Sequence, residues 1–363
     1  MYYWDDDFIA GERRRKKKRH VLGPASMGER EAEKIRDEVL RPLNQGLVKI
    51  GSATKFEDYV ETVYVPVVLP TMAKSTRDRA MSVYKNYLKP AFAGMCLRDL
   101  SPLTVQRFVS GMANWNLAQE SKDKIRDVLS SVMASAVRYK LVLTNPVEGV
   151  KLPAPKRGKR RKPFITQEQL ALMLDWVKEP YATMLYVAVF TGLRVSELVA
   201  LRWRNVGLNS ITVEERYCRG DWGAPKSEAS NATVPVNRAV LERIDRLKTM
   251  TIEVKAGRAV RKYAAVKAGG PDDLVFQSVA KGAPMRDNNI LVRHIKPAAK
   301  AIGLPWINWQ VLRRSFAMCL KKKGADVKDA QALMRHSKAS TTIDVYMQFD
   351  SESQREVVDR LVN

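Results

Sequence analysis

The sequence predicts a mainly helical protein with a small β-sheet, an α+β fold divided into more than one domain. The chain has 363 residues, whereas domains average roughly 100 to 200 residues. Apolar residues recur at helical spacing through most of it, while strand-like runs occur at residues 210–217 and 232–236. We therefore expect four parts, which are residues 1–53, 54–150, 151–163 and 164–363.

Residues 1–53 combine a dense basic block with a short helical pattern. The block covers residues 13–19, and like charges at this density repel one another when they are packed together. We expect the block to form a flexible basic arm. Residues 31–43 place Ile35 and Val39 on one helical face, which predicts a short helix after the arm.

Residues 54–150 carry apolar side chains at helical spacing, beginning with Phe56 and Tyr59. Helix starts are predicted at Ser75, at Ser101 with Pro102 as the first helical residue, and at Ser121, the first helix ending at Tyr87 and the last at Tyr139. The pattern predicts a small all-helical domain.

Residues 151–163 follow Asn145 and Pro146, which break the helical pattern. This stretch is too rich in proline and basic residues to fold alone. We interpret it as a basic linker between domains that can lie along a phosphate backbone.

Residues 164–363 mix helices and strands. Thr166 is predicted to begin a helix that ends at Trp176, a second helix covers Tyr181 to Val189, and a third begins near Arg194. After the two strand-like runs and Phe276, the pattern is helical again to the end of the chain. We expect a mixed domain with a helical tail.

The charge balance points to a polyanionic partner. Lys and Arg number 63 against 39 Asp and Glu, a formal net charge of +24. Duplex DNA, with one charge per roughly 1.7 Å of axis, is the commonest large polyanion, although ribosomal RNA or a basic surface without a partner also fits the charge. The residues expected to contact DNA are Arg13, Arg14, Arg15, Lys16, Lys17 and Lys18 in the arm, and Lys156, Arg157, Lys159, Arg160, Arg161 and Lys162 in the linker.

The composition argues against a disulfide-stapled protein, a metalloprotein and a membrane protein. Cys96, Cys218 and Cys319 are widely spaced and are expected to be buried thiols, not a disulfide framework or a zinc site. No carboxylate accompanies a histidine at metal-ligand spacing, so no metal and no other cofactor is expected. No apolar run approaches the roughly 18 residues that span a bilayer, and the N-terminal residues lack a secretory pattern. We expect a cytoplasmic protein with no membrane role.

Three segments carry candidate chemistry. The first is TGLRVSELVALRW, in which Gly192 permits a tight turn, Arg194 begins a helix, and Glu197 can buttress its guanidinium from the same face. The second is WQVLRRSFA, where Arg313 projects beside an apolar helical face. The third is MRHSKASTTIDVY, where Ser340 or Thr341 is expected to cap a short helix that presents Tyr346.

In this order and at this separation, the three segments resemble the catalytic domain of tyrosine recombinases, the family of phage integrases. The resemblance covers roughly residues 54–350. It implies that Arg194 and Arg313 clamp a phosphate, that Glu197 is a structural acid, that Lys226 is the catalytic lysine, that His336 is the family's histidine, and that Tyr346 is the nucleophile. It also implies a core-binding domain of SAM-like fold at residues 54–150, which closes with the catalytic domain around DNA.

The chemistry of phosphodiester cleavage supports these roles. Attack on a phosphodiester builds charge on its non-bridging oxygens, and two guanidinium groups can meet that charge with bidentate hydrogen bonds, without metal or ATP. Tyr has a reference pKa of about 10, and nearby positive charge favours its phenolate. Lys226 can protonate the departing 5′-hydroxyl if the cationic site lowers its pKa. A 3′-phosphotyrosine link then preserves the energy of the broken strand for rejoining.

The sequence departs from the family pattern at two positions. Gln310 stands where the family usually has His, and Gln can donate a hydrogen bond to a phosphate but cannot transfer a proton at neutral pH. Arg335 stands where Gly is common, which adds a third cation either within the site or on its rim.

The favoured function is a site-specific recombinase or integrase of a phage or other mobile element. Its expected partners are double-stranded DNA attachment sites, a homotetramer on DNA, and accessory DNA-bending or directionality proteins. The tail from Phe349 to Asn363 has an apolar face that packs either on a neighbouring subunit or on its own domain. The alternatives are a catalytically impaired DNA-binding relative, favoured by Gln310, and a relaxing enzyme similar to type IB topoisomerases.

Overall fold

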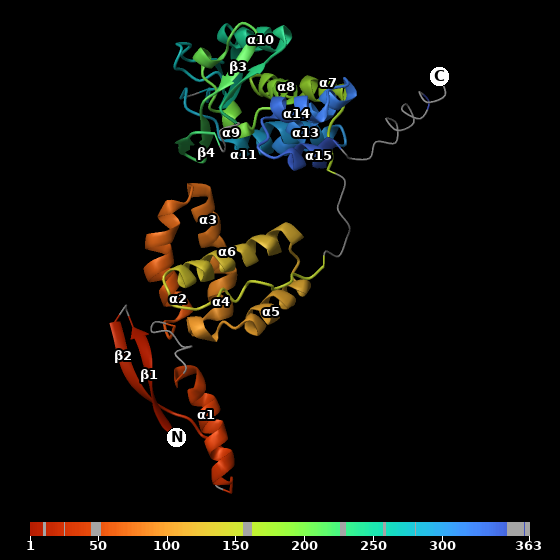
Figure 1. Ribbon diagram of the computed structural model, residues 1–363. Coiled ribbons are helices and arrows are strands. Elements are labelled where there is room, and N and C mark those ends of the chain that lie inside the picture. Colours follow the sequence, from red (N-terminus) through yellow and green to blue (C-terminus); the bar gives the residue numbers. More distant parts are fainter. Residues whose placement is uncertain are drawn as a thin grey trace. The chain divides into compact units, whose positions relative to one another are not determined.

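A computed structural model describes residues 1–9, 12–24, 26–44, 52–154, 162–225, 230–256, 259–279, 281–346 and 359. The chain divides into two compact units, Met1–Gly158 and Lys159–Asn363 (Figure 1). Helices dominate both units, and the described strands pair two by two in antiparallel ladders. The predicted mainly helical α+β class is therefore confirmed.

The basic block near the N-terminus forms a strand. β1 (Tyr2–Ile9) pairs antiparallel with β2 (Glu12–Arg19), and the register sets Asp5 opposite Lys16 and Asp7 opposite Arg14. The sequence led us to expect a flexible arm here, whereas the structure describes a strand whose backbone pairs with β1. The predicted helix after the block is confirmed as α1 (Glu29–Asn44).

The first unit continues as an all-helical region. Its helices and helical turns are α2 (Phe56–Tyr59), a π-helical segment (Val60–Val68), a 3₁₀ turn (Leu69–Thr71), α3 (Lys74–Val83), a second π-helical segment (Tyr84–Leu88), α4 (Lys89–Phe92), a 3₁₀ turn (Leu97–Asp99), α5 (Pro102–Gly111), a 3₁₀ turn (Met112–Asn114) and α6 (Gln119–Arg138). Side chains such as Phe56, Phe92 and Leu129 are almost wholly buried in its own core.

The predicted helix starts in this region are partly right. Ser101 caps α5, since its hydroxyl accepts a hydrogen bond from the Thr104 amide at 3.1 Å. The other two predictions were wrong: α3 begins at Lys74 after Ala73, and α6 begins at Gln119. Each helix thus begins before the serine that was predicted to cap it. The residues at the two actual N-caps, Ala73 and Ala118, form no capping hydrogen bond through their side chains.

The second unit mixes helices and short strands. Its helices are α7 (Gln167–Trp176), α8 (Tyr181–Thr191), α9 (Val195–Leu198), α10 (Arg238–Asp245), α11 (Asp287–Ile290), α12 (Lys296–Ala301), α13 (Trp309–Lys322), α14 (Val327–Met334) and α15 (Ala339–Tyr346), with a π-helical segment (Leu291–Ile295) and 3₁₀ turns (Trp203–Asn205 and Arg246–Lys248). Its strands are β3 (Ser210–Val213), β4 (Arg216–Cys218), β5 (Asp221–Gly223), β6 (Ala232–Pro235), β7 (Thr251–Ala256) and β8 (Ala259–Ala264).

Several sequence predictions for this unit need correction. The run at residues 210–217 divides into two strands, because β3 pairs with β6 while β4 turns back onto β5. The ladder of β7 and β8 was not predicted. At α15 the helix begins at Ala339, so Ser340 and Thr341 lie in its first turn and do not cap it. The predicted start at Thr166 is confirmed by its hydrogen bond from the Gln169 amide.

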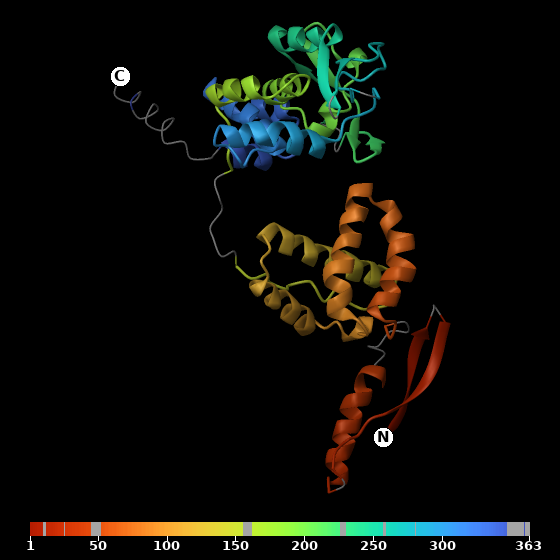
Figure 2. The same cartoon turned by 180° about the vertical axis from the view of Figure 1, so that it is seen from behind.

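A buried helix forms the centre of the second unit. Most side chains of α8, including Met184, Leu185 and Val187, are excluded from solvent, and α13 packs against it. A smaller apolar cluster, which includes Phe316 and Met334, joins α13 to α14. In Figures 1 and 2 the helices α7, α8, α13, α14 and α15 gather in one half of the unit and the labelled strands in the other.

Two smaller expectations concern membranes and thiols. Within the described residues, no helix is both long and apolar enough to cross a membrane. Cys96, Cys218 and Cys319 are free thiols, but each is only half-buried, so the expectation of buried thiols was too strong.

Candidate active site

A tight turn at Gly192 leads from α8 to Arg194. Gly192 ends α8 with φ of 60°, a left-handed conformation that favours glycine. A Cβ at this position would lie 2.3 Å from Cδ1 of Phe316. Any larger residue would therefore force the α8–α13 packing apart, and the turn delivers Arg194 to the residue just before α9.

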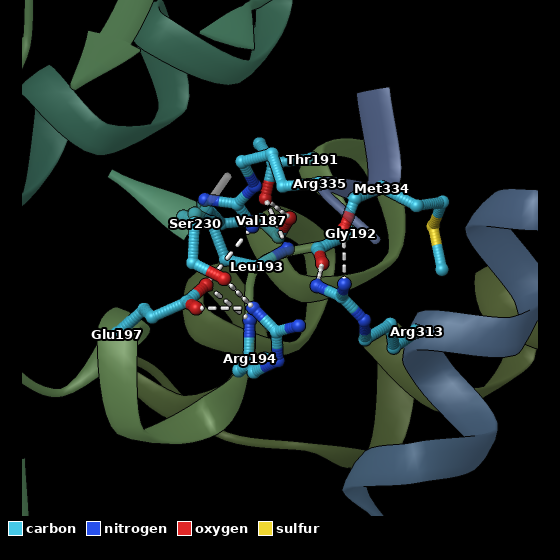
Figure 3. Close-up of polar contacts among 10 residues, drawn as sticks. All are labelled: Val187, Thr191, Gly192, Leu193, Arg194, Glu197, Ser230, Arg313, Met334 and Arg335. Carbon is cyan, nitrogen blue, oxygen red and sulfur yellow. Dashed lines mark hydrogen bonds and ion pairs between the residues drawn. The ribbon is translucent and has the colours of Figure 1, made fainter. Parts of the chain in front are cut away.

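A buried carboxylate fixes the guanidinium of Arg194. Glu197 Oε1 accepts a hydrogen bond from Arg194 Nη1 at 2.8 Å, and Oε2 accepts one from the Arg194 amide at 2.9 Å (Figure 3). Arg194 Nη1 also donates to Ser230 Oγ at 2.9 Å. The Glu197 side chain is 2% exposed, whereas that of Arg194 is 28% exposed. The acid thus holds the arginine in place and leaves part of its guanidinium accessible.

Arg313 projects from α13 toward the same region. Its Nη1 donates to the main-chain carbonyl of Gly192 and its Nη2 to that of Met334 (Figure 3). Burial, together with the charges of Arg194 and Arg335, lowers the pKa of Arg313 to about 9. That value is still well above neutral pH, so the guanidinium remains charged. Each terminal nitrogen keeps a second N–H that can donate to an anion.

Arg335 lies inside the cluster and contacts Glu197 (Figure 3). It ends α14 with φ of 53°, and its side chain is 1% exposed. Nη2 donates to Glu197 Oε2 at 2.9 Å. The sequence alone left open whether this cation stands within the site or on its rim. The structure places it in the interior.

His336 follows directly and contacts the helix that carries Tyr346. Its Nδ1 lies 2.9 Å from the hydroxyl of Thr342, a residue of α15 that is 1% exposed. Burial and the charges of Arg313, Arg194 and Arg335 lower the pKa of His336 to about 4. The imidazole is therefore neutral at pH 7, and Nδ1 is held by Thr342.

The structure describes some of the remaining candidate residues and not others. Gln310 is exposed in the first turn of α13, three residues before Arg313. Tyr346 is the last residue of α15, and its backbone is described while its side chain is not. Lys162 is exposed, and Lys17 lies over the ring of Tyr2 with Nζ 4.9 Å from its centroid. The predictions that fall on residues outside the description are those for Lys226, Lys156, Arg157, Lys159, Arg160, Arg161 and most of the tail after residue 346.

The arrangement suits an anion with several oxygen atoms. Arg194, Arg313 and Arg335 together carry three positive charges, and Glu197 offsets one of them. The two partly accessible arginines come from α13 and from the turn before α9, so they offer donors from two directions to one phosphate group. Within the described residues, no group of His, Cys, Asp and Glu side chains has the geometry to hold a metal ion.

Comparison with known proteins shows that the segment containing this site matches a known protein family. The model of the phage integrase family matches residues 163–353, which contain each of the arginines described above. The ICEBs1 integrase of Bacillus subtilis (strain 168) is 23% identical over 364 residues, covering 98% of this chain and 94% of that protein. The integrase of Mycobacterium phage L5 is 24% identical over 297 residues, covering 82% of this chain and 76% of that protein.

Solved structures share the fold at low identity. The integrase of transposon Tn1549 in complex with a circular intermediate DNA gives a TM-score of 0.63 at 16% identity, covering 84% of this chain and 98% of that one. A lambda integrase tetramer bound to a Holliday junction gives a TM-score of 0.61 at 19% identity, covering 96% of this chain and 94% of that one. The chain thus has the fold of both proteins across most of its length.

Proposed function

Since the chain belongs to the phage integrase family, we infer that its second unit breaks and rejoins DNA strands with Tyr346 as the nucleophile and Arg194 and Arg313 as the phosphate clamp. The protein is accordingly a site-specific tyrosine recombinase that acts on DNA. One observation carries the assignment of residues. Arg194 and Arg313, which are far apart in the chain, converge on one cluster that also contains Glu197.

The two arginines stabilise charge on the phosphate. When a nucleophile attacks a phosphodiester, negative charge grows on the two non-bridging oxygens. Arg194 is 28% exposed and held by a buried acid, and Arg313 is held by two main-chain carbonyls. Neither guanidinium has to reorganise during the reaction, and such preorganisation is what makes an electrostatic contribution large.

His336 would act on the phosphate through its second ring nitrogen. Its pKa of about 4 keeps the imidazole neutral at pH 7, so Nε2 would donate a hydrogen bond to a phosphate oxygen. The same low pKa makes it a weak base for the phenol proton of Tyr346 in the DNA-free protein. The hydroxyl of Thr342 can donate to Nδ1 or accept from it, and either tautomer is therefore supported. Thr342 lies on the helix that ends at Tyr346, so the base and the nucleophile belong to one connected segment.

Lys226 and Gln310 complete the proposed site. Lys226 would protonate the 5′-oxygen as the strand breaks, which makes a 5′-hydroxyl the leaving group and leaves a 3′-phosphotyrosine link. Gln310, exposed one turn before Arg313, would donate an amide N–H to a non-bridging oxygen. The link stores the energy of the broken bond, so a 5′-hydroxyl from a partner strand can reverse the reaction.

The larger assembly follows from the reaction. Exchange between two duplexes requires four strand cuts, so we propose that four copies assemble on a pair of double-stranded attachment sites. The lambda integrase that shares this fold was crystallised as a tetramer bound to a Holliday junction. The helical region of the first unit, the strand β2 and the linker of residues 151–163 would bind flanking duplex, with accessory DNA-bending or directionality proteins setting the outcome.

Covalent capture from a random pool tests the proposal even though the target sequence is not specified in advance. Random-sequence duplexes with one nick are incubated with the protein, because a short fragment that leaves at the nick traps the covalent intermediate. Denaturant-resistant adducts are then isolated and sequenced. Enrichment of one sequence in the adducts supports site-specific cleavage. Tight binding without any adduct would instead support a DNA-binding protein that has lost catalysis.

A further inference from the structure

We propose that Arg335 is a positioning residue that offsets the negative charge of Glu197 beside Arg194 and ties the α14–α15 junction to the arginine clamp. The inference rests on the proposed function, since it concerns the same phosphate site. Arg335 joins residues that are 138 positions apart in the chain through its hydrogen bond to Glu197. The carboxylate it contacts is the one that holds Arg194.

Burial excludes a direct contact between Arg335 and DNA. Its side chain is 1% exposed, so a phosphate cannot reach it in this conformation. Its Nε and Nη1 atoms are buried, and neither has a hydrogen-bond partner among the described residues. A buried guanidinium with unsatisfied N–H groups destabilises the fold, and its φ of 53° is a further strain for a residue with a side chain. A residue that weakens the fold in two ways is best explained by a role in the site.

The first role is electrostatic. Glu197 Oε2 accepts hydrogen bonds from both the Arg194 amide and Arg335 Nη2, while Oε1 accepts from Arg194 Nη1. If Arg335 were absent, the buried carboxylate would face Arg194 alone and would neutralise more of its charge. With Arg335 present, the carboxylate is shared between two cations, and Arg194 and Arg313 keep more attraction for a developing phosphate charge.

The second role is mechanical. Arg335 stands between Met334, whose carbonyl accepts from Arg313, and His336, whose Nδ1 contacts Thr342 on α15. Three consecutive residues therefore connect α14 to α13, to the acid of α9 and to the helix that ends at Tyr346. Loss of the central contact would let the His336 and Tyr346 segment shift relative to the phosphate clamp.

The test compares cleavage rate with DNA affinity. The substrate is the nicked duplex that the wild-type protein enriches, and the variants are Arg335→Met, Arg335→Gly and Arg335→Lys. Arg335→Met removes the charge at similar length. Arg335→Gly also removes it but suits the left-handed backbone, so this variant folds even if Arg335→Met does not. Arg243→Met is the matched control, because Arg243 forms an ion pair with Glu179 at 3.0 Å in the same unit, away from the clamp.

The expected result separates chemistry from binding. At saturating protein, Arg335→Met and Arg335→Gly should form the covalent adduct roughly 10- to 100-fold more slowly, the usual range for a group that orients a reactive residue. Their Kd for the duplex should stay within about threefold of wild type, because Arg335 does not touch DNA. Arg335→Lys should recover a large part of the rate, and Arg243→Met should match wild type.

Two results would overturn the inference. A saturated rate within about twofold of wild type for the folded Met or Gly variant would leave Arg335 without a role in cleavage. A rate for Arg335→Lys as low as that for Arg335→Met would show that the charge is irrelevant. Failure of the proposed function is distinguishable from both, because the wild-type protein would then give no adduct.

Discussion

The guanidinium of Arg313 donates a hydrogen bond to the main-chain carbonyl of Gly192, 121 residues earlier in the chain. Gly192 is also the residue whose left-handed backbone delivers Arg194 to its position before α9. One turn therefore positions one arginine through the backbone and the other through its carbonyl oxygen. The positions of both clamp arginines therefore depend on the geometry of this turn.

Replacing Gly192 with Ala should destabilise the second unit. The left-handed φ of 60° and the Cβ position 2.3 Å from Cδ1 of Phe316 together should cost roughly 2–4 kcal/mol of unfolding free energy. Gly324→Ala is the matched control, since Gly324 has φ of 83° but an added Cβ meets nothing within 4 Å. It should cost only about 1 kcal/mol. Urea unfolding of both variants measures the difference, and equal losses would contradict the packing argument.

Removing either clamp arginine should slow cleavage without abolishing binding. Arg194→Ala and Arg313→Ala should each lower the rate of adduct formation at saturating protein by about 10²- to 10³-fold, the usual effect of one lost donor to a transition-state oxygen. Arg313→Lys should be nearly as slow, because a compact ammonium lacks the planar fork whose two terminal nitrogens reach Gly192 and Met334 separately. Single-turnover kinetics measure these rates, and a wild-type rate for either Ala variant would refute the clamp.

Gln310 should contribute through hydrogen bonding alone. Gln310→Ala should lower the saturated cleavage rate by about tenfold, since one hydrogen bond to a charged oxygen is lost. Gln310→His should cleave at least as fast as wild type, because imidazole can also donate to the phosphate. A variant Gln310→Ala that cleaves at the wild-type rate would show that this exposed side chain does not reach the phosphate.

His336 should make stability depend on pH in the DNA-free protein. Its pKa of about 4 lies below the value of about 6.5 expected in the unfolded chain. Between these values the unfolded chain binds a proton that the folded protein does not, so the unfolding free energy should fall as pH falls from about 6.5 to 4. Above about 7 the contribution is fully present. Denaturant titrations at several pH values give the unfolding free energy of wild type and of His336→Gln. Between about pH 4 and about 6.5 this free energy should fall more steeply with falling pH in wild type, and parallel pH dependences would contradict the shifted pKa.

Much of the fold could be predicted from local patterns. The buried run of α8, the cap at Thr166 and the Ser101–Pro102 start each depend on neighbours within one or two turns, so the sequence displays them directly. Predictions failed where distant segments decide the outcome. The strand β2 exists because β1 pairs with it, and the basic block alone gives no sign of that partner.

The candidate site shows the same division. The spacing of Arg194 and Glu197 on one helical face predicted their contact, because residues three apart in a helix are neighbours. The burial of Arg335 could not be predicted, because it requires the acid of α9 to meet the end of α14. The hydrogen bond between His336 and Thr342 was likewise missed, although Thr342 lies within the third of the three candidate segments. The available signal was the position of Thr342, a hydroxyl-bearing residue six positions after the candidate base His336.

The identity of the residue bonded to DNA is the most direct test of the account. The covalent adduct from the enriched nicked duplex is digested with protease and nuclease, and mass spectrometry locates the nucleotide on the remaining peptide. We predict a 3′-phosphate linked to Tyr346, and no adduct for Tyr346→Phe although that variant binds the duplex with wild-type affinity. A nucleotide attached to another residue, or an undiminished adduct in Tyr346→Phe, would contradict the assigned nucleophile.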